Sequence, residues 1–390
     1  MKTALAALLA VVGLSPVRSA CEDVDTYFGS ISRITSGDAD NDFDLAYGAS
    51  EVNLGLLTKL ECPSDEDTEI VIVIGTDLTI KSDIDAASSV QFKNIRFTVE
   101  EGASLVFEMY VQFGPNSQEA YSNAFRVHEN SSVTFMSNFH ASGIQSAFRN
   151  SGLVEFKASS LFNDNLNVFY INTGDIKFRD NAVFKDNAYH GIENHSTGFV
   201  RFSKKATFTA NGATFDDTSG CGLENYGTVI FRGDATFENH TCREAAAVYN
   251  AGKMRFYGKT IFNDNINEDV EGSGSGLGQG GGLRTWDGSD LIFKGDVEFN
   301  RNTGDVGGGF AVVGGDVRFR EAVSFTDNSA TMDGGGFAVV GGSVTFRQPS
   351  LVTGSGNQAA SECSFGYVEE GGALVGFGDE ACEESTAFGA

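Results

Sequence analysis

Two phenylalanines that recur six residues apart constrain the fold of this chain more than any other feature. These pairs are Phe107/Phe113, Phe156/Phe162, Phe178/Phe184, Phe202/Phe208, Phe231/Phe237, Phe256/Phe262, Phe293/Phe299 and Phe319/Phe325. From Phe135, a degenerate member, the leading phenylalanines follow at steps of 21, 22, 24, 29, 25, 37, 26 and 27 residues. A period of about 25 residues that tolerates insertions predicts a solenoid, in which each repeat packs mainly on its neighbours.

Each repeat contains three short segments separated by turn residues. The segment at the leading phenylalanine alternates in polarity, as in Ile176-Lys177-Phe178-Arg179, and this is the pattern of a strand with one buried face. A glycine-rich element such as GGGFAVVGG at 307–315 closes each repeat. We therefore expect an all-β chain that forms a parallel β-helix of roughly ten three-strand coils. It would be a monomeric rod about 50 Å long, with phenylalanine stacked on phenylalanine inside.

The sequence predicts four regions along the chain. Residues 4–14 form an apolar run after Lys2 that is too short to cross a bilayer, and we expect residues 1–20 to be a secretory signal peptide. Open sheet edges at the ends of a rod promote aggregation unless they are covered. We therefore expect an N-terminal cap over 21–67, repeats over 68–362 and a C-terminal cap over 363–390. No later stretch has the roughly 20 apolar residues of a membrane helix, so we expect a secreted, extracellular or cell-surface protein.

The six cysteines all follow the predicted signal peptide, and an even number in an exported protein favours disulfides. Neighbours in sequence suggest the pairs Cys21–Cys62, Cys221–Cys242 and Cys363–Cys382, which is one of several connectivities that six cysteines allow. The outer pairs would staple the two caps. Sequons for N-glycosylation begin at Asn130, Asn194 and Asn239.

The charge of the chain is strongly acidic, with 53 acidic and 27 basic residues and a formal net charge of −26. This balance argues against nucleic acid as a partner. Lys and Arg nevertheless occupy ten of the sixteen positions directly before and after the leading phenylalanines from Phe156 to Phe346. We call the following eight residues the basic stripe: Lys177, Arg179, Arg201, Arg232, Arg255, Lys294, Arg318 and Arg320.

Two interpretations of the basic stripe follow from its stacking on one face of the rod. The functional interpretation is that it binds an anionic polymer, such as a uronate or a sulfated glycan. The alternative is that these cations pair with acidic residues of neighbouring segments, such as Asp164, Asp186 and Asp234, and keep the face soluble. A charged strand face is usually only solvated, and this favours the alternative.

The second phenylalanine is often followed three residues later by asparagine, as in Phe162–Asn165 and Phe325–Asn328. These FxxN tetrads alternate with Gly-Gly-Gly-Phe or Gly-Gly-Ala-Leu elements, and together they resemble the repeats of the chlamydial polymorphic outer membrane proteins over about residues 90–378. The resemblance implies a right-handed parallel β-helix of the pectate-lyase-like type, used in adhesion or surface structure. In that family a C-terminal membrane barrel of alternating strands follows the repeats; we expect no such barrel here, and therefore no self-display in an outer membrane.

The remaining candidate sites have simple structural explanations. We expect the asparagines to turn the chain in the left-handed region and to hydrogen-bond along the stack, and the glycine triplets to mark tight turns with positive φ. Asp38, Asp40, Asp42 and Asp44 have the alternate spacing of calcium ligands, but Phe43 and Ala49 stand where an EF-hand needs Gly and Glu. An acidic cap loop is therefore expected there, with an irregular calcium site as the alternative and no other cofactor.

The sequence contains no recognisable catalytic motif. The five histidines share no column in the repeat, and His190 and His195 are expected to lie in turns. We expect a non-catalytic β-helix with a role in adhesion, in the extracellular matrix or in surface structure, which binds anionic extracellular polysaccharide or surface proteins. The alternative is a polysaccharide lyase, hydrolase or epimerase that acts on acidic polysaccharide; this alternative rests on analogy of fold.

Overall fold

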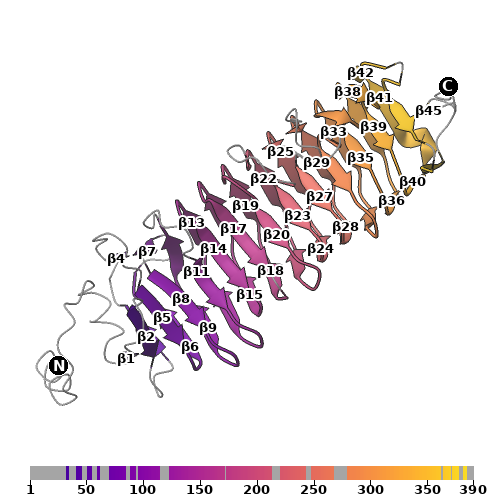
Figure 1. The fold of residues 1–390 in the computed structure, drawn as a ribbon. Coiled ribbons are helices and arrows are strands. Elements are labelled where there is room, and N and C mark those ends of the chain that lie inside the picture. Colours follow the sequence, from indigo (N-terminus) through magenta and orange to yellow (C-terminus); the bar gives the residue numbers. More distant parts are fainter. Residues whose placement is uncertain are drawn as a thin grey trace, which may run out of the picture.

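The computed structural model shows a straight rod, with strands 32–34 and 381–383 at opposite ends (Figure 1). It describes residues 32–34, 41–45, 51–54, 59–61, 70–84, 88–93, 95–114, 123–171, 173–212, 220–242, 247–267, 279–361, 363–369, 371–376 and 381–383. Three long sheets of 15, 13 and 12 strands, here sheets A, B and C, run along the rod, and a short sheet of five strands accompanies them in the C-terminal half. The predicted parallel β-helix is confirmed.

The chain visits sheets B, C and A in turn, so each strand pairs with its equivalent in the next coil. Sheet A contains β1 (Ser32–Ile34), β2 (Asn41–Leu45), β5 (Ile70–Ile74), β8 (Ile95–Val99), β11 (Asn123–Val127), β14 (Ser146–Asn150), β17 (Asn167–Ile171), β20 (Ile192–Asn194), β23 (Leu223–Asn225), β27 (Val248–Asn250), β31 (Leu283–Thr285), β35 (Phe310–Val312), β39 (Phe337–Val339), β43 (Gly366–Val368) and β45 (Ala381–Glu383). Sheet B contains β3 (Glu51–Asn53), β6 (Leu78–Lys81), β9 (Ser104–Phe107), β12 (Ser132–Phe135), β15 (Leu153–Phe156), β18 (Asp175–Phe178), β21 (Phe199–Phe202), β24 (Thr228–Phe231), β28 (Lys253–Phe256), β32 (Asp290–Phe293), β36 (Asp316–Phe319), β40 (Ser343–Phe346) and β44 (Ala373–Val375).

Sheet C contains β4 (Lys59–Glu61), β7 (Ser89–Lys93), β10 (Tyr110–Phe113), β13 (Phe139–Ser142), β16 (Ser160–Asn163), β19 (Ala182–Lys185), β22 (Ala206–Thr209), β25 (Ala235–Glu238), β29 (Thr260–Asn263), β33 (Val297–Asn300), β37 (Val323–Thr326) and β41 (Val352–Ser355). The short sheet contains β26 (Thr241–Cys242), β30 (Ile266–Asn267), β34 (Thr303–Val306), β38 (Ser329–Asp333) and β42 (Gln358–Ala359). A single 3-10 turn, η1 (Pro349–Leu351), is the one helical element among the described residues, and none of them forms a helix with the length and hydrophobicity of a membrane span.

Stacked phenylalanine rings fill the interior of the rod. The leading phenylalanines form one column on sheet B, where the rings of Phe178 and Phe202 lie 4.7 Å apart and within 3° of parallel. The second phenylalanines form a column on sheet C, as with Phe184 and Phe208 at 4.6 Å. Each ring touches rings of other columns edge-on, for example Phe202 and Phe208 at 5.9 Å and 80°. Such stacked and edge-to-face contacts add to the burial energy of the rings and fix the register of the coils.

The asparagines of the FxxN tetrads form a buried ladder of hydrogen bonds beside sheet C. Where asparagine follows asparagine, the backbone N–H donates to the side-chain oxygen of the next coil, as from Asn302 to Asn328 at 3.0 Å. The Asn302 side-chain amide donates to the Asn328 oxygen and to the carbonyl of Phe262 in the preceding coil, both at 3.0 Å. The predicted bonding along the stack is confirmed. The prediction that these asparagines adopt the left-handed conformation is wrong, because the residue before each one does so, for example Asp264 with φ 54° and Asp327 with φ 54°.

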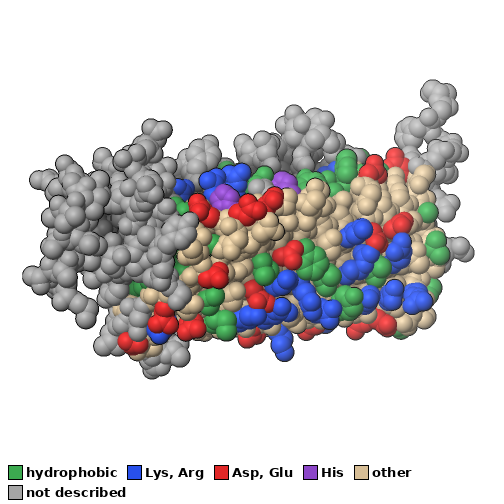
Figure 2. All heavy atoms as spheres, turned by 90° about the horizontal axis from the view of Figure 1, so that it is seen from below, with side chains coloured by type: hydrophobic (Ala, Val, Ile, Leu, Met, Phe, Trp, Pro, Cys, Tyr) green, Lys and Arg blue, Asp and Glu red, His purple; other side chains and the backbone are tan. Residues whose placement is uncertain are grey.

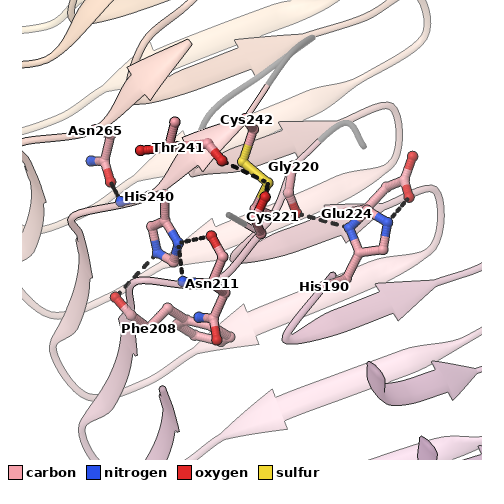
Figure 3. Close-up of a disulfide and its surroundings, with 11 residues drawn as sticks. His190, Phe208, Asn211, Gly220, Cys221, Glu224, His240, Thr241, Cys242 and Asn265 are labelled. Carbon is pink, nitrogen blue, oxygen red and sulfur yellow. Dashed lines mark hydrogen bonds and ion pairs between the residues drawn. A yellow bond between two sulfur atoms is a disulfide. The ribbon is translucent and has the colours of Figure 1, made fainter. Parts of the chain in front are cut away.

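His240 replaces asparagine at one position of this ladder (Figure 3). Its Nδ1 accepts the Asn211 N–H at 3.1 Å, and its Nε2 lies 3.2 Å from the carbonyl of Phe208. Nδ1 as acceptor and Nε2 as donor correspond to a neutral ring. Complete burial lowers the pKa of His240 to about 4, against the opposing effect of the carbonyls of Asn211 and Phe208.

The glycine triplets have two separate structural reasons. The first glycine of a triplet has positive φ, such as 71° at Gly307 and 68° at Gly334. The other two are needed because coils approach closely: a Cβ on Gly309 would lie 2.3 Å from the carbonyl oxygen of Gly336. The prediction of positive φ therefore holds for the first glycine, and close backbone approach explains the rest.

A second ladder of buried amides follows sheet A, which the sequence analysis did not predict. Nδ2 of Asn194 donates to Asn225 at 2.8 Å, and Nδ2 of Asn225 donates to Asn250 at 2.7 Å. Asn194 is completely buried. Glycosylation of Asn194 stays a prediction, and a glycan on Nδ2 would require this ladder to be broken. Asn130 and Asn239 are exposed, and their glycosylation stays a prediction.

Stacked strands extend into both segments predicted as caps. At the N-terminal end β2 already pairs in parallel with β5, and β1 pairs with β2 in antiparallel fashion. At the C-terminal end β45 pairs with β43. The disulfide Cys221–Cys242 is present and links successive coils, with its Cα atoms 6.3 Å apart. The pairings Cys21–Cys62 and Cys363–Cys382 stay predictions, since Cys21 and Cys62 lie outside the described residues and the side chain of Cys382 is not described.

The substitution His240→Asn should remove a pH-dependent loss of stability. The unfolded chain binds a proton near the ordinary histidine pKa of 6.5, whereas the folded chain does so at about 4. Above pH 6.5 the titration of His240 therefore does not lower the free energy of unfolding. As the pH drops from 6.5 to 4, it lowers that free energy by roughly 3 kcal/mol. Asparagine would keep the ladder bonds without titrating. Chemical unfolding of both proteins from pH 7 to pH 4 tests this, and an equal loss in both would contradict it.

Candidate functional site

The basic stripe lies on sheet B and in the turns that follow its strands. Register places Lys177 beside Arg201, and it places Arg255 and Arg318 on either side of Ile292. Figure 2 shows Lys and Arg in a row along this face, with acidic side chains among them. Parallel strands are about 4.8 Å apart, so like charges in neighbouring coils repel one another.

Carboxylates pair with four of the eight residues of the basic stripe. Lys177 pairs with Asp175 at 3.5 Å, and the other three are Arg179, Arg255 and Arg318. Asp290 is paired with Arg255 and, at 3.2 Å, with Arg318. Glu155 is paired with Lys157 and, at 2.6 Å, with Arg179. Burial raises the pKa of Glu155, but the hydrogen bonds from Lys157 and Arg179 outweigh burial and the pKa is lowered. Arg318 also pairs with Asp316 at 3.0 Å, so the two arginines beside Asp290 are balanced by two carboxylates. The single carboxylate of Glu155 leaves a net positive charge beside Lys157 and Arg179.

Four residues of the stripe have no ion pair within the described part of the chain: Arg201, Arg232, Lys294 and Arg320. Lys294 instead lies over the ring of Tyr257, with Nζ 4.0 Å from its centroid, and Arg232 approaches the same ring at 5.9 Å. The acids named in the alternative interpretation are not the partners found. Asp186 pairs with Lys185 at 3.2 Å, and Asp234 accepts the backbone N–H of Lys259.

The described residues contain no group of three or more His, Cys, Asp or Glu placed to hold a metal ion. Asp38 and Asp40 lie outside the described residues, and Asp42 and Asp44 lie in β2, where side chains are not described. The calcium prediction for this segment therefore stays a prediction.

Sheet A carries a second candidate face, where side chains that break the repeat are stacked in one outward column. In successive coils the column holds Tyr170, Glu193, Glu224, Tyr249 and Arg284. We call these five residues, with His190, His195, Tyr226 and Trp286 beside them, the sheet A cluster. Unlike the stripe, it combines carboxylates, imidazoles and aromatic rings.

The two carboxylates of the sheet A cluster lie side by side in adjacent coils, and a histidine accompanies each. Nε2 of His195 is 2.9 Å from Glu193, and Nε2 of His190 is 3.6 Å from Glu224. Figure 3 shows His190 directed toward Glu224, with the Cys221–Cys242 disulfide between this pair and His240. The Tyr226 hydroxyl donates to Glu224 at 2.7 Å. Burial raises the pKa of Glu193, and burial and the bond to Glu224 raise the pKa of Tyr226.

Aromatic rings continue this cluster along the rod. The rings of Tyr170 and His195 lie 4.6 Å apart, those of His195 and Tyr226 lie 6.3 Å apart, and those of Tyr226 and Tyr249 lie 5.8 Å apart. The guanidinium of Arg284 then lies over the rings of both Tyr249 and Trp286, at 5.9 Å and 4.8 Å. Tyr226 and Trp286 are each 40% exposed, whereas Glu224 is 7% exposed. Buried polar groups therefore support an exposed aromatic surface.

Sequence reasoning missed the sheet A cluster. His190 and His195 lie outside strands, as expected for turn residues. His195 contacts Glu193 of its own segment, whereas stacking of the coils brings His190 to Glu224 of the next coil. The signal was present in the closing elements, where Glu-Asn-His at 193–195 and Glu-Asn-Tyr at 224–226 align on their asparagines.

Replacing Glu193 by glutamine should stabilise the fold at neutral pH. A carboxyl whose pKa is raised on folding contributes stability below the ordinary value of about 4.3, and that contribution is lost as the pH rises through the folded value. Glutamine removes the buried charge, so the melting temperature at pH 7 should rise and the gain should shrink toward pH 4. Glu298→Gln, at a half-exposed ion pair with Lys259, should change it little. A lower melting temperature for Glu193→Gln at pH 7 would contradict this account.

A scan against protein-family models found no match, and comparisons with curated proteins and with solved structures found none either. The resemblance to the chlamydial repeats therefore stays a prediction from the FxxN and glycine motifs.

Proposed function

We propose that this protein is a secreted or cell-surface rod that binds anionic polysaccharide along the basic stripe of sheet B, in an adhesive or matrix role. The observation that carries the proposal is the group of four stripe cations without a carboxylate partner among the described residues: Arg201, Arg232, Lys294 and Arg320. An acidic chain has many carboxylates with which to neutralise such a face, yet no described carboxylate pairs with these four cations.

The geometry suits an extended polymer. Successive coils present cations at intervals of about 4.8 Å along a straight face, so a chain of uronate or sulfated sugars that runs parallel to the rod meets charge after charge. Arginine binds carboxylates and sulfates through two parallel hydrogen bonds. The cation–π contacts of Arg232 and Lys294 with Tyr257 hold both side chains near the surface.

A triple variant tests the stripe directly. Arg201→Ser, Arg232→Ser and Lys294→Ser together should weaken binding to immobilised polygalacturonate or dextran sulfate by at least about tenfold, because three charge-assisted contacts are lost. Retention of the native protein should fall as salt rises. The matched control is Lys185→Ser, Lys259→Ser and Arg301→Ser, which changes the charge equally but removes cations paired with carboxylates outside the stripe. Equal loss in both triple variants would refute a role for the stripe.

The proposed role is non-catalytic, whereas the alternative is a lyase, hydrolase or epimerase that acts on acidic polysaccharide. We expect the size distribution of polygalacturonate to stay constant during incubation with the protein, as followed by size-exclusion chromatography. Polymer incubated without protein is the control. Shortening of the polymer by the native protein would overturn the proposal and favour a lyase or a hydrolase.

A further inference from the structure

We propose that the sheet A cluster is a second binding site, which takes a neutral saccharide chain lying parallel to the rod. This inference does not depend on the basic stripe, because the cluster lies on a different sheet and its residues are of a different kind. It begins from the two exposed rings of Tyr226 and Trp286, which are 40% exposed on a protein whose other rings are mostly interior.

The rings are held before any ligand arrives. Tyr226 is fixed by its hydrogen bond to Glu224, and Trp286 is fixed beneath the guanidinium of Arg284. Arg284 is itself 6% exposed and also covers Tyr249. A platform of ordered rings loses little conformational entropy on binding, and this favours affinity.

The polar groups around the rings match sugar hydroxyls, which both donate and accept hydrogen bonds. Glu193 and Glu224 supply acceptors, while His190 and His195 carry ring nitrogens beside them. An apolar surface with a few oriented polar groups is the usual composition of a small-ligand site. A sugar ring stacks its C–H face on an aromatic ring and directs its hydroxyls outward from its rim. One sugar residue is about as long as the spacing between coils, roughly 4.8 Å.

The charges of the sheet A cluster argue against a polyanion, a cation or a protein as its ligand. The adjacent carboxylates of Glu193 and Glu224 repel a uronate or sulfated chain. The positive charge of Arg284, which lies over Tyr249 and Trp286, repels a cationic ligand from the same rings. The cores of protein interfaces are depleted in charged residues, but here two glutamates lie at the centre of the cluster. A neutral saccharide therefore fits this face better than a polyanion, a cation or a protein partner.

Trp286 is the single tryptophan of the chain, so its fluorescence reports on this site alone. We would titrate the native protein with four neutral hexasaccharides: cellohexaose, xylohexaose, laminarihexaose and chitohexaose. We expect a saturable change in Trp286 fluorescence with at least one of them. No saturable change with any of the four would overturn the proposal.

Variants assign the binding to the cluster. Tyr226→Ala should weaken the affinity by about tenfold or more, because one stacking platform is lost, and Tyr226→Phe should retain most of it. Leu351→Ala is the matched control, since Leu351 is 42% exposed and lies outside the cluster. The triple stripe variant should bind the saccharide as the native protein does, so failure of the stripe proposal leaves this one standing. Undiminished binding by Tyr226→Ala, or loss in the stripe variant, would refute the site.

Discussion

Register between coils is the constraint on which the rest of this structure depends. Parallel pairing places each residue beside its equivalent in the next coil, so phenylalanine meets phenylalanine and asparagine meets asparagine. A slip of one residue would bring the outward side chains into the core. The buried amides add a second condition, since Asn302 must reach both Asn328 and the carbonyl of Phe262. Interior packing thus fixes one register between the coils, and this register also determines which outward residues lie beside one another.

The outward-facing residues of sheets A and B form two surfaces of different composition. On sheet B the repeated Lys and Arg positions accumulate positive charge, and carboxylates such as Asp290 and Asp316 neutralise only part of it. On sheet A the outward residues change from coil to coil, and a local group of Glu, His, Tyr and Trp results. Burial raises the pKa of Glu193, so its ionised form is less stable there than in water.

The sequence was sufficient for the elements that repeat and insufficient for those that do not. Paired phenylalanines predicted the strands of sheets B and C, and the asparagines predicted their own ladder, although the left-handed residue proved to be its predecessor, as at Asp264. The closing strands are three residues long in much of sheet A and lack a phenylalanine in the middle of the rod. Their alignment, and hence the meeting of Glu193 with Glu224, depends on turns of unequal length that periodicity cannot position. The burial of Asn194 in the second ladder could not be predicted for the same reason.

The central claim is that one register creates two independent ligand faces. The most direct test is to measure the affinity of a neutral hexasaccharide, by Trp286 fluorescence, with and without saturating polygalacturonate. The account predicts the same dissociation constant within about twofold, and a complex that contains both ligands. Competition between the two saccharides, with the hexasaccharide displaced as polygalacturonate is added, would show a shared site and contradict the account.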